Sequence, residues 1–469
     1  MPRPRDNLSP PDNESTADLR RRLLDSLAYI CDSEKGGDTM TAIFVSSPPL
    51  TYHLARNKKP SDPGEVLAFL KSVLNQLENV DEHDRDRSQS LLAECIQFSE
   101  KRIKAYKRML QIRLKICFEL AAGTEIRQRL QKIAQVLEES AESYVDLCRR
   151  CFAMVKSQDM SIITAQAIRS EDYGHGRNPF AELRHFVGRI GSHVQVVKVL
   201  LVAARRLPIL FKDFEIEIVT GPTSPAPIPR ARNQLTLSGI ANRLASNDGE
   251  LTKEVQGRLE LLNQAMDLEQ TIRKEYSEKG QKPQIHAELI LLEHYYRNRE
   301  ILQFYDSDRY IGASKPACYC CSLYFREHPG DLAQPASHQK IYLNWVPPMS
   351  ASDAQEQNSE SAIHERAMLN RMVKSIRTTA IEQLRQQTGP SKRMRQFDSI
   401  TWESLPRGLD PAILDAVSLG KPPDTVPKAK GRKNPKKAET GISELLTEKM
   451  SISDGDDTDD EGGVALVTR

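Results

Sequence analysis

The sequence predicts a mixed α/β fold with a long helical segment between two regions that contain strands. Three observations support this prediction. Runs of β-branched and aromatic residues on either side of residues 46–49 predict a β-hairpin. Apolar residues recur every three or four positions over residues 60–206, as in amphipathic helices. Helix-like and strand-like segments alternate over residues 281–346, which indicates a sheet covered by helices.

The N-terminal region contains the first helix and the hairpin. Residues 1–16 are polar and contain several prolines, so we expect them to be disordered. A helix is expected over residues 17–31, because its leucines recur at helical spacing, and the glycines at 36 and 37 interrupt that pattern. The segments TMTAIFV and LTYHLARN, residues 39–45 and 50–57, are the two predicted strands of the hairpin.

The middle of the chain is predominantly helical. Helical spacing persists through most of residues 61–280, with an interruption at Gly123. One strand, FEIEIV, is expected at residues 214–219. The proline-rich segment that follows it has the composition of a loop or linker. Two more helices are expected over roughly residues 234–276.

The C-terminal part contains the segment with the most informative residues. A helix that begins at His286, the strand DRYIG, a helix that begins at Cys318 and the strand KIYLNWV are expected in this order. Residues 351–389 are helical and polar, and FDSITW at 397–402 is a candidate short strand. Beyond Gly420 we expect a disordered tail, in which a basic cluster precedes an acidic one.

Composition indicates a soluble, intracellular protein. The chain has 469 residues, of which 39% are hydrophobic and 28% charged. No apolar run approaches the length of a membrane span, and the N-terminus lacks the apolar segment of a secretory signal. Eight cysteines in so long a chain suggest reduced thiols, in the cytoplasm or the nucleus. The net charge of +2 does not by itself predict a nucleic-acid partner, and the oligomeric state stays open.

Three residues form a candidate metal site in the pattern H-x-E followed by C-x-x-C. His286, Cys318 and Cys321 supply one imidazole and two thiolates, which is a zinc donor set that leaves a fourth position for water. Two cysteines three apart at a helix start lie on one face, whereas Cys320 points away and is excluded as a ligand. A helix N-terminus also stabilises the thiolate form that binds metal.

Glu288 is the candidate proton-transfer residue. Glu288 lies two positions after His286. Zinc-bound water has a pKa of about 7, and a carboxylate at this place could move its protons. A fourth protein ligand would instead close the site and make it structural. His294, His328 and His338 are the candidates for that role, and a pattern without metal is the remaining alternative.

The motif His286-Ala287-Glu288 with Cys318 and Cys321 resembles the cytidine deaminase superfamily, whose zinc nucleobase deaminases carry this signature. The hairpin region and SKPACYCCSLYF are similar to a mainly fungal branch of nucleic-acid and nucleotide deaminase-like proteins related to predicted bacterial toxin deaminases. Two features depart from the superfamily pattern, since Ala317 separates Pro316 from the first cysteine and Cys320 is additional.

The resemblance implies a helix–sheet–helix sandwich with a mixed sheet of about five strands. It divides the core into residues 17–60 and 281–350, separated by a mainly helical insertion over 61–280. A helical extension over 351–418 and a disordered tail over 419–469 follow.

The function that the resemblance implies is hydrolytic deamination of a nucleobase, cytosine or adenine, free or within nucleic acid, with Zn²⁺ as cofactor and zinc-activated water as nucleophile. The enzyme would be a hydrolase of C–N bonds in cyclic amidines. Asn57, at the end of the second hairpin strand, takes the place of a residue that contacts the substrate sugar or base in related enzymes. The residue type also suits a simple turn before Lys58.

Two other functions compete with this one. The first is a catalytically inactive interaction protein, in which zinc stabilises the fold and the long helices bind a partner. The second is another metallohydrolase, although peptidase zinc ions usually take histidine and carboxylate ligands. The expected partners are a nucleobase, a nucleoside or nucleic acid, and no membrane.

Overall fold

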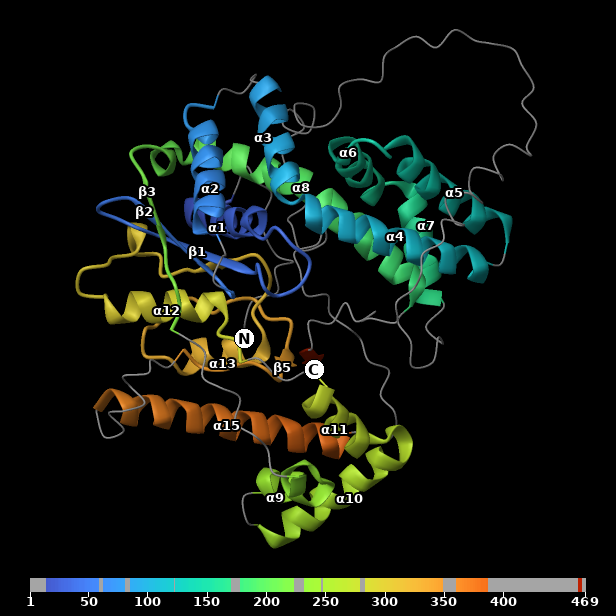
Figure 1. Ribbon diagram of the computed structural model, residues 1–469, viewed down its shortest axis with the longest axis vertical. Helices are drawn as coiled ribbons and strands as arrows, with labels where there is room; N and C mark the ends of the chain where they lie inside the picture. The colour runs from blue at the N-terminus through green and yellow to red at the C-terminus, as the bar shows by residue number, and fades with distance from the viewer. Residues whose placement is uncertain are drawn as a thin grey trace.

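The computed structural model describes residues 14–58, 62–80, 85–121, 123–169, 178–222, 232–245, 248–278, 283–348, 360–386 and 463–465. The fold is mixed α/β and mostly helical (Figure 1), as the sequence predicts. The candidate strand at 397–402 and both charged clusters of the tail lie outside the described residues. Three residues of the predicted tail, Gly463–Ala465, form the short strand β6.

The central sheet has four strands in the order β3-β2-β1-β4. The predicted hairpin is confirmed as β1, Thr41–Ser46, antiparallel to β2, Thr51–Arg56. Strand β3, Glu215–Ile218, runs parallel to β2, and β4, Gly312–Ala313, is antiparallel to β1. β5, Lys340–Tyr342, pairs with β6 in a separate two-stranded sheet, so the central sheet has four described strands and not about five.

Helices cover both faces of the central sheet. Helix α1, Thr16–Cys31, with Ser15 as its N-cap, packs against β1 and β4. Helix α12, Ala287–Arg297, packs against β1 and β2 from the other side (Figure 1). Side chains of β1 alternate accordingly: Ile43 belongs to the core with α1, and Phe44 to the core with α12.

Most helices of the middle segment share one hydrophobic core with α1. They are α2 Pro63–Leu77, α3 Arg85–Phe98, α4 Glu100–Leu120, α5 Thr124–Glu139, α6 Tyr144–Val155, α7 Gln158–Arg169 and α8 Pro179–Arg206. Although no uninterrupted apolar run approaches a membrane span, α8 is long and apolar enough to cross a membrane by length and composition. However, 94% of its most apolar window is buried inside the fold, as in a core helix of a soluble protein.

The remaining helices lie on the far side of α12. Helix α13, Tyr319–Glu327, packs on α15, Glu360–Gln386, which continues to a small cluster of helices (Figure 1). That cluster consists of α9 Leu237–Ala245, α10 Gly249–Met266 and α11 Leu268–Glu278. The described helices between residues 61 and 280 thus belong to two hydrophobic cores, and strand β3 joins the central sheet.

Gly312 permits the close approach of β4 to α1. A Cβ atom at this position would lie 2.5 Å from the carbonyl carbon of Leu24 and 2.7 Å from the amide nitrogen of Asp25. Both are backbone atoms of α1, which cannot move aside as a flexible side chain would. We expect Gly312→Ala to lower the free energy of unfolding by about 1–3 kcal/mol, measured by denaturant unfolding.

Gly257→Ala is the matched control for Gly312→Ala. Gly257 is exposed in α10, and a Cβ atom there would meet nothing within 4 Å. Because alanine favours a helix over glycine, this control is expected to leave stability unchanged or raise it by up to about 1 kcal/mol. Equal effects of the two substitutions would contradict the role assigned to Gly312.

Candidate metal centre

Two of the three candidate ligands occupy the N-caps of helices, as the sequence predicts. His286 is the N-cap of α12, and Cys318 is the N-cap of α13. The Cys318 thiol accepts a hydrogen bond from the backbone N–H of Cys321 at 3.3 Å, so it performs the capping function that serine or aspartate usually performs. Both helices therefore begin beside the same point, and their N-termini favour negative charge there.

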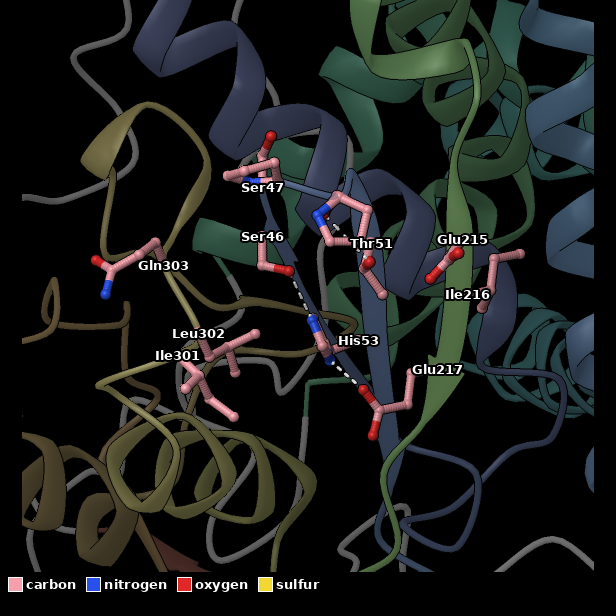
Figure 2. Close-up of a pocket in the computed structure, with 12 residues that line it drawn as sticks. Ser46, Ser47, Thr51, His53, Glu215, Ile216, Glu217, Ile301, Leu302 and Gln303 are labelled. Atoms are coloured by element: carbon pink, nitrogen blue, oxygen red, sulfur yellow. Dashed lines mark hydrogen bonds and ion pairs between the residues drawn. The ribbon is translucent and has the colours of Figure 1, made fainter.

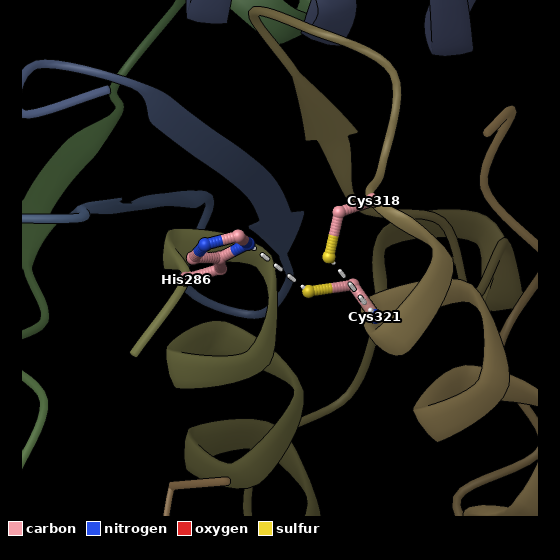
Figure 3. A group of neighbouring side chains, drawn as sticks. All are labelled: His286, Cys318 and Cys321. Carbon is pink, nitrogen blue, oxygen red and sulfur yellow. Dashed lines mark hydrogen bonds between the residues drawn. The ribbon is translucent and has the colours of Figure 1, made fainter. Parts of the chain in front are cut away.

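The three candidate ligands converge in one buried cluster (Figure 3). Their ligand atoms all lie within 4.8 Å of one another, and His286 Nδ1 is 3.3 Å from Cys321 Sγ. Tetrahedral zinc with bonds of 2.0–2.3 Å would place such atoms about 3.5–3.8 Å apart. The arrangement is thus close to the spacing that the donor set of one imidazole and two sulfurs requires.

The two thiols differ in acidity because they lie against each other. Burial opposes ionisation of Cys318, yet its pKa lies well below the usual value because Cys321 donates to its sulfur and His286 is adjacent. Burial and then the neighbouring Cys318 raise the pKa of Cys321 well above its usual value. The first thiolate therefore opposes ionisation of the second, and a cation between the two sulfurs would favour both thiolates.

Trp345 also contacts the cluster. Its indole N–H donates a hydrogen bond to Cys321 Sγ at 3.2 Å. Such a donor lowers the negative charge on a ligating sulfur and fixes its position. No local sequence pattern signals this bond, because the two residues are 24 positions apart. Cys321 lies in α13, whereas Trp345 follows strand β5.

Glu288 lies beside the cluster in the first turn of α12. It is only 2% exposed, and its Oε1 is 4.0 Å from His286 Nδ1. Among the described residues, neither carboxylate oxygen has a hydrogen-bond partner of normal geometry. Burial raises the pKa of Glu288 above its usual value, although His286 opposes this. The nearest opposite charge to this buried carboxylate is thus a candidate ligand, which keeps Glu288 beside the position that a metal-bound water would take.

Residues 285–349 match the family model described as OTT_1508-like deaminase. No curated protein and no solved structure matches the chain. The matched segment contains the three candidate ligands and Glu288, and it excludes the hairpin and the helical middle. A relationship to deaminases is therefore supported for this deaminase-like segment.

Asn57 joins the hairpin to the deaminase-like segment. Its Oδ1 accepts a hydrogen bond from the backbone N–H of Ala287 at 2.7 Å, and its own N–H donates to the carbonyl of Met40. The side chain thus satisfies an amide at the start of α12 and holds the helix against the end of β2. Contact of Asn57 with a substrate remains a prediction.

The candidate fourth ligands lie elsewhere. His328 is 3.0 Å from Glu293, His338 accepts a hydrogen bond from the backbone N–H of Lys340, and His294 lies near Glu217. Within the described ranges, the cluster at the helix starts contains only the two cysteines and His286. Cys320 does not belong to it either, and burial raises the pKa of that thiol. The arrangement accordingly favours an open site over a closed structural one.

Proposed function

We propose that the protein is a zinc-dependent hydrolytic deaminase of a nucleobase. The observation that carries this proposal is the meeting of one imidazole, two thiols and a buried carboxylate in the deaminase-like segment. Sulfur and imidazole donors suit Zn²⁺ better than the hard cations Mg²⁺ or Ca²⁺. His286, Cys318 and Cys321 would hold the ion. When bound, zinc would polarise a water molecule and lower its pKa toward about 7.

Glu288 would move the protons of the reaction. Its carboxylate would accept a proton from the attacking water and deliver it to a ring nitrogen of the base. It would then carry a second proton to the leaving amine, so that an amidine and water become a carbonyl group and ammonia. The burial that raises the pKa of Glu288 favours this role, because a raised pKa makes the carboxylate a stronger base toward the proton of the attacking water.

The finer parts of the proposal concern the substrate and the family branch. We infer a cytidine-deaminase-like core, in which α1 and α12 sandwich the sheet, in the mainly fungal branch related to bacterial toxin deaminases. The substrate would be cytosine or adenine, free or within nucleic acid, with Asn57 in contact with it. The protein would act in the cytoplasm or the nucleus.

Ammonia release by the purified, zinc-loaded protein tests the proposal. The panel should comprise free bases, nucleosides, nucleotides, single-stranded DNA and RNA. We expect release from at least one cytosine or adenine compound, with uracil or hypoxanthine as the product. Zinc binding without turnover of any compound would favour the alternative, an inactive interaction protein in which zinc stabilises the fold.

Loss of the Trp345 hydrogen bond is expected to weaken metal binding. Trp345→Phe keeps an aromatic ring and removes the N–H that contacts Cys321. Outer-shell donors of this kind typically contribute 10–100-fold to metal affinity. Competition with a chromophoric chelator should therefore show zinc affinity lower by about 10–100-fold.

Tyr319→Phe provides the control for Trp345→Phe. Its hydroxyl bonds to Thr379 on α15 at 2.9 Å and not to a candidate ligand. This variant also loses one hydrogen-bonding group from the same segment, but its zinc affinity should match that of the unaltered protein. The same loss of affinity in both variants would mean that general loosening, and not the bond to sulfur, is responsible.

A further inference from the structure

A second cluster of ligand-type side chains lies at the other end of α12. His53 on β2, Glu217 on β3 and His294 near the end of α12 place their ligand atoms within 4.8 Å of one another. His53 Nδ1 is 2.8 Å from Glu217 Oε2, and His294 Nε2 is 3.8 Å from the same oxygen. Figure 2 shows Ser46, His53 and Glu217 in a row across β1, β2 and β3.

This cluster is distinct from the candidate deaminase centre. His294 follows His286 by eight residues, which corresponds to about 12 Å along a helix. On β2, His53 precedes Asn57 by four residues, about 13 Å along a strand. One group of polar side chains therefore lies at each end of the contact between β2 and α12.

Packing fixes the ring of His53 with one nitrogen toward Glu217. The residue is only 2% exposed, and its ring stacks on Phe44 with centroids 4.4 Å apart. Its Nε2 lies 2.8 Å from Ser46 Oγ. A proton on Nε2 would be donated to that hydroxyl and would leave a lone pair on Nδ1. Among the described residues, Nδ1 has no hydrogen-bond partner of normal geometry, despite the close carboxylate.

Both histidines are predominantly neutral near pH 7. Burial lowers the pKa of His53 to about 4, although Glu217 favours the charged form and His294 opposes it. Burial also lowers the pKa of His294, again against the influence of Glu217. Neutral imidazoles are the form that binds metal ions. The cluster thus combines two neutral imidazoles with one carboxylate.

We propose that His53, Glu217 and His294 form a second binding site, for a divalent first-row transition-metal ion such as Zn²⁺. Two histidines and one carboxylate are an established donor set for such ions, with the remaining positions taken by water or a ligand. The contact between Ser46 and Nε2 is the outer-shell bond that orients a ligating histidine. A cavity of about 340 Å³ adjoins His53 and Glu217 and is lined also by Thr51, so a small polar ligand could reach the ion.

The same row of side chains has the order of a Ser–His–Glu hydrolase triad, but the surrounding backbone does not suit that reaction. The N–H of Ser47 already donates to the carbonyl of Gln303 at 3.1 Å. Pro48 and Pro49, which also line the cavity, have no N–H. The residues after Ser46 thus offer no pair of donors for an oxyanion. The third ligand-type residue, His294, has no place in a triad but is needed at a metal site.

Metal stoichiometry tests the second site independently of any catalytic activity. The full-length protein should be equilibrated with Zn²⁺, freed of excess ion and analysed for zinc per chain. We expect two ions in the unaltered protein and one in Glu217→Gln and in His294→Ala. Glu217 is half exposed on an edge strand, so its replacement should leave the fold intact, as circular dichroism would verify.

Glu215→Gln is the matched control, because Glu215 is an exposed carboxylate on the same strand and lines the same cavity. It should retain two ions. With Co²⁺, Glu217→Gln should keep the thiolate-to-metal charge-transfer absorption that Cys321→Ser loses. Two ions in Glu217→Gln would overturn the proposal. So would a single ion in the unaltered protein that is lost only in the cysteine variants. Labelling of Ser46 by a fluorophosphonate would also contradict it, because it would indicate a reactive serine.

Discussion

Replacing Glu288 with glutamine is expected to lower the rate of deamination by roughly 10²–10⁴-fold, because the variant cannot accept and return a proton. Glutamine has nearly the same shape, so the variant should keep the fold and the zinc content of the unaltered protein. Its carboxamide also removes the buried negative charge. The measurement is initial ammonia release from the substrate that the panel identifies, together with zinc per chain.

Glu300→Gln is a suitable control for Glu288→Gln. Glu300 is exposed beyond the end of α12, so its replacement removes the same charge far from the cluster. Full activity is expected for this variant. Equal turnover by Glu288→Gln and the unaltered protein would exclude Glu288 as the proton-transfer residue. Loss of zinc from Glu288→Gln would instead indicate that the carboxylate supports metal binding.

Removing one sulfur from the candidate centre is expected to abolish both metal binding at that centre and activity. Cys321→Ser changes the residue whose thiol contacts His286 and Trp345, and its backbone N–H bonds to Cys318. A serine hydroxyl is a much poorer zinc ligand than a thiolate. Because the bound ion would lower the activation barrier by several kcal/mol, its loss should reduce the rate by at least about 10³-fold.

Cys320→Ser tests whether the loss in Cys321→Ser is specific. Cys320 is the adjacent residue and is also buried, but its sulfur lies outside the cluster. Zinc content and activity should persist in this variant, with at most a modest loss of stability. Retention of zinc at the centre by Cys321→Ser, or equal loss by both variants, would be incompatible with the assigned ligands.

The parts of the fold that the sequence predicts are those with a local pattern. The hairpin on either side of residues 46–49 and the helix starts at His286 and Cys318 follow from strand residues, turn residues and the H-x-E and C-x-x-C spacings. The leucines of α1 recur at helical spacing, and they are buried on one face of the helix, as that spacing predicts. Local spacing also excludes Cys320, because neighbouring helix positions point in different directions.

The parts that sequence reasoning missed depend on pairing between distant residues. The parallel alignment of β3 with β2 brings Glu217 to His53, and no local pattern encodes the pairing of strands so far apart. β5 has the composition of a sheet strand, but it pairs with β6 and not with the central sheet. The bond from Trp345 to Cys321 and the contact of Asn57 with Ala287 likewise arise only once the chain has folded.

X-ray absorption at the zinc edge tests the central claim most directly. The Glu217→Gln variant should be used, so that only the centre at the starts of α12 and α13 contributes. We predict one zinc per chain with two sulfur ligands, one imidazole nitrogen and one further oxygen or nitrogen ligand. A chain that binds no zinc under these conditions, or a spectrum without sulfur neighbours, would contradict the account.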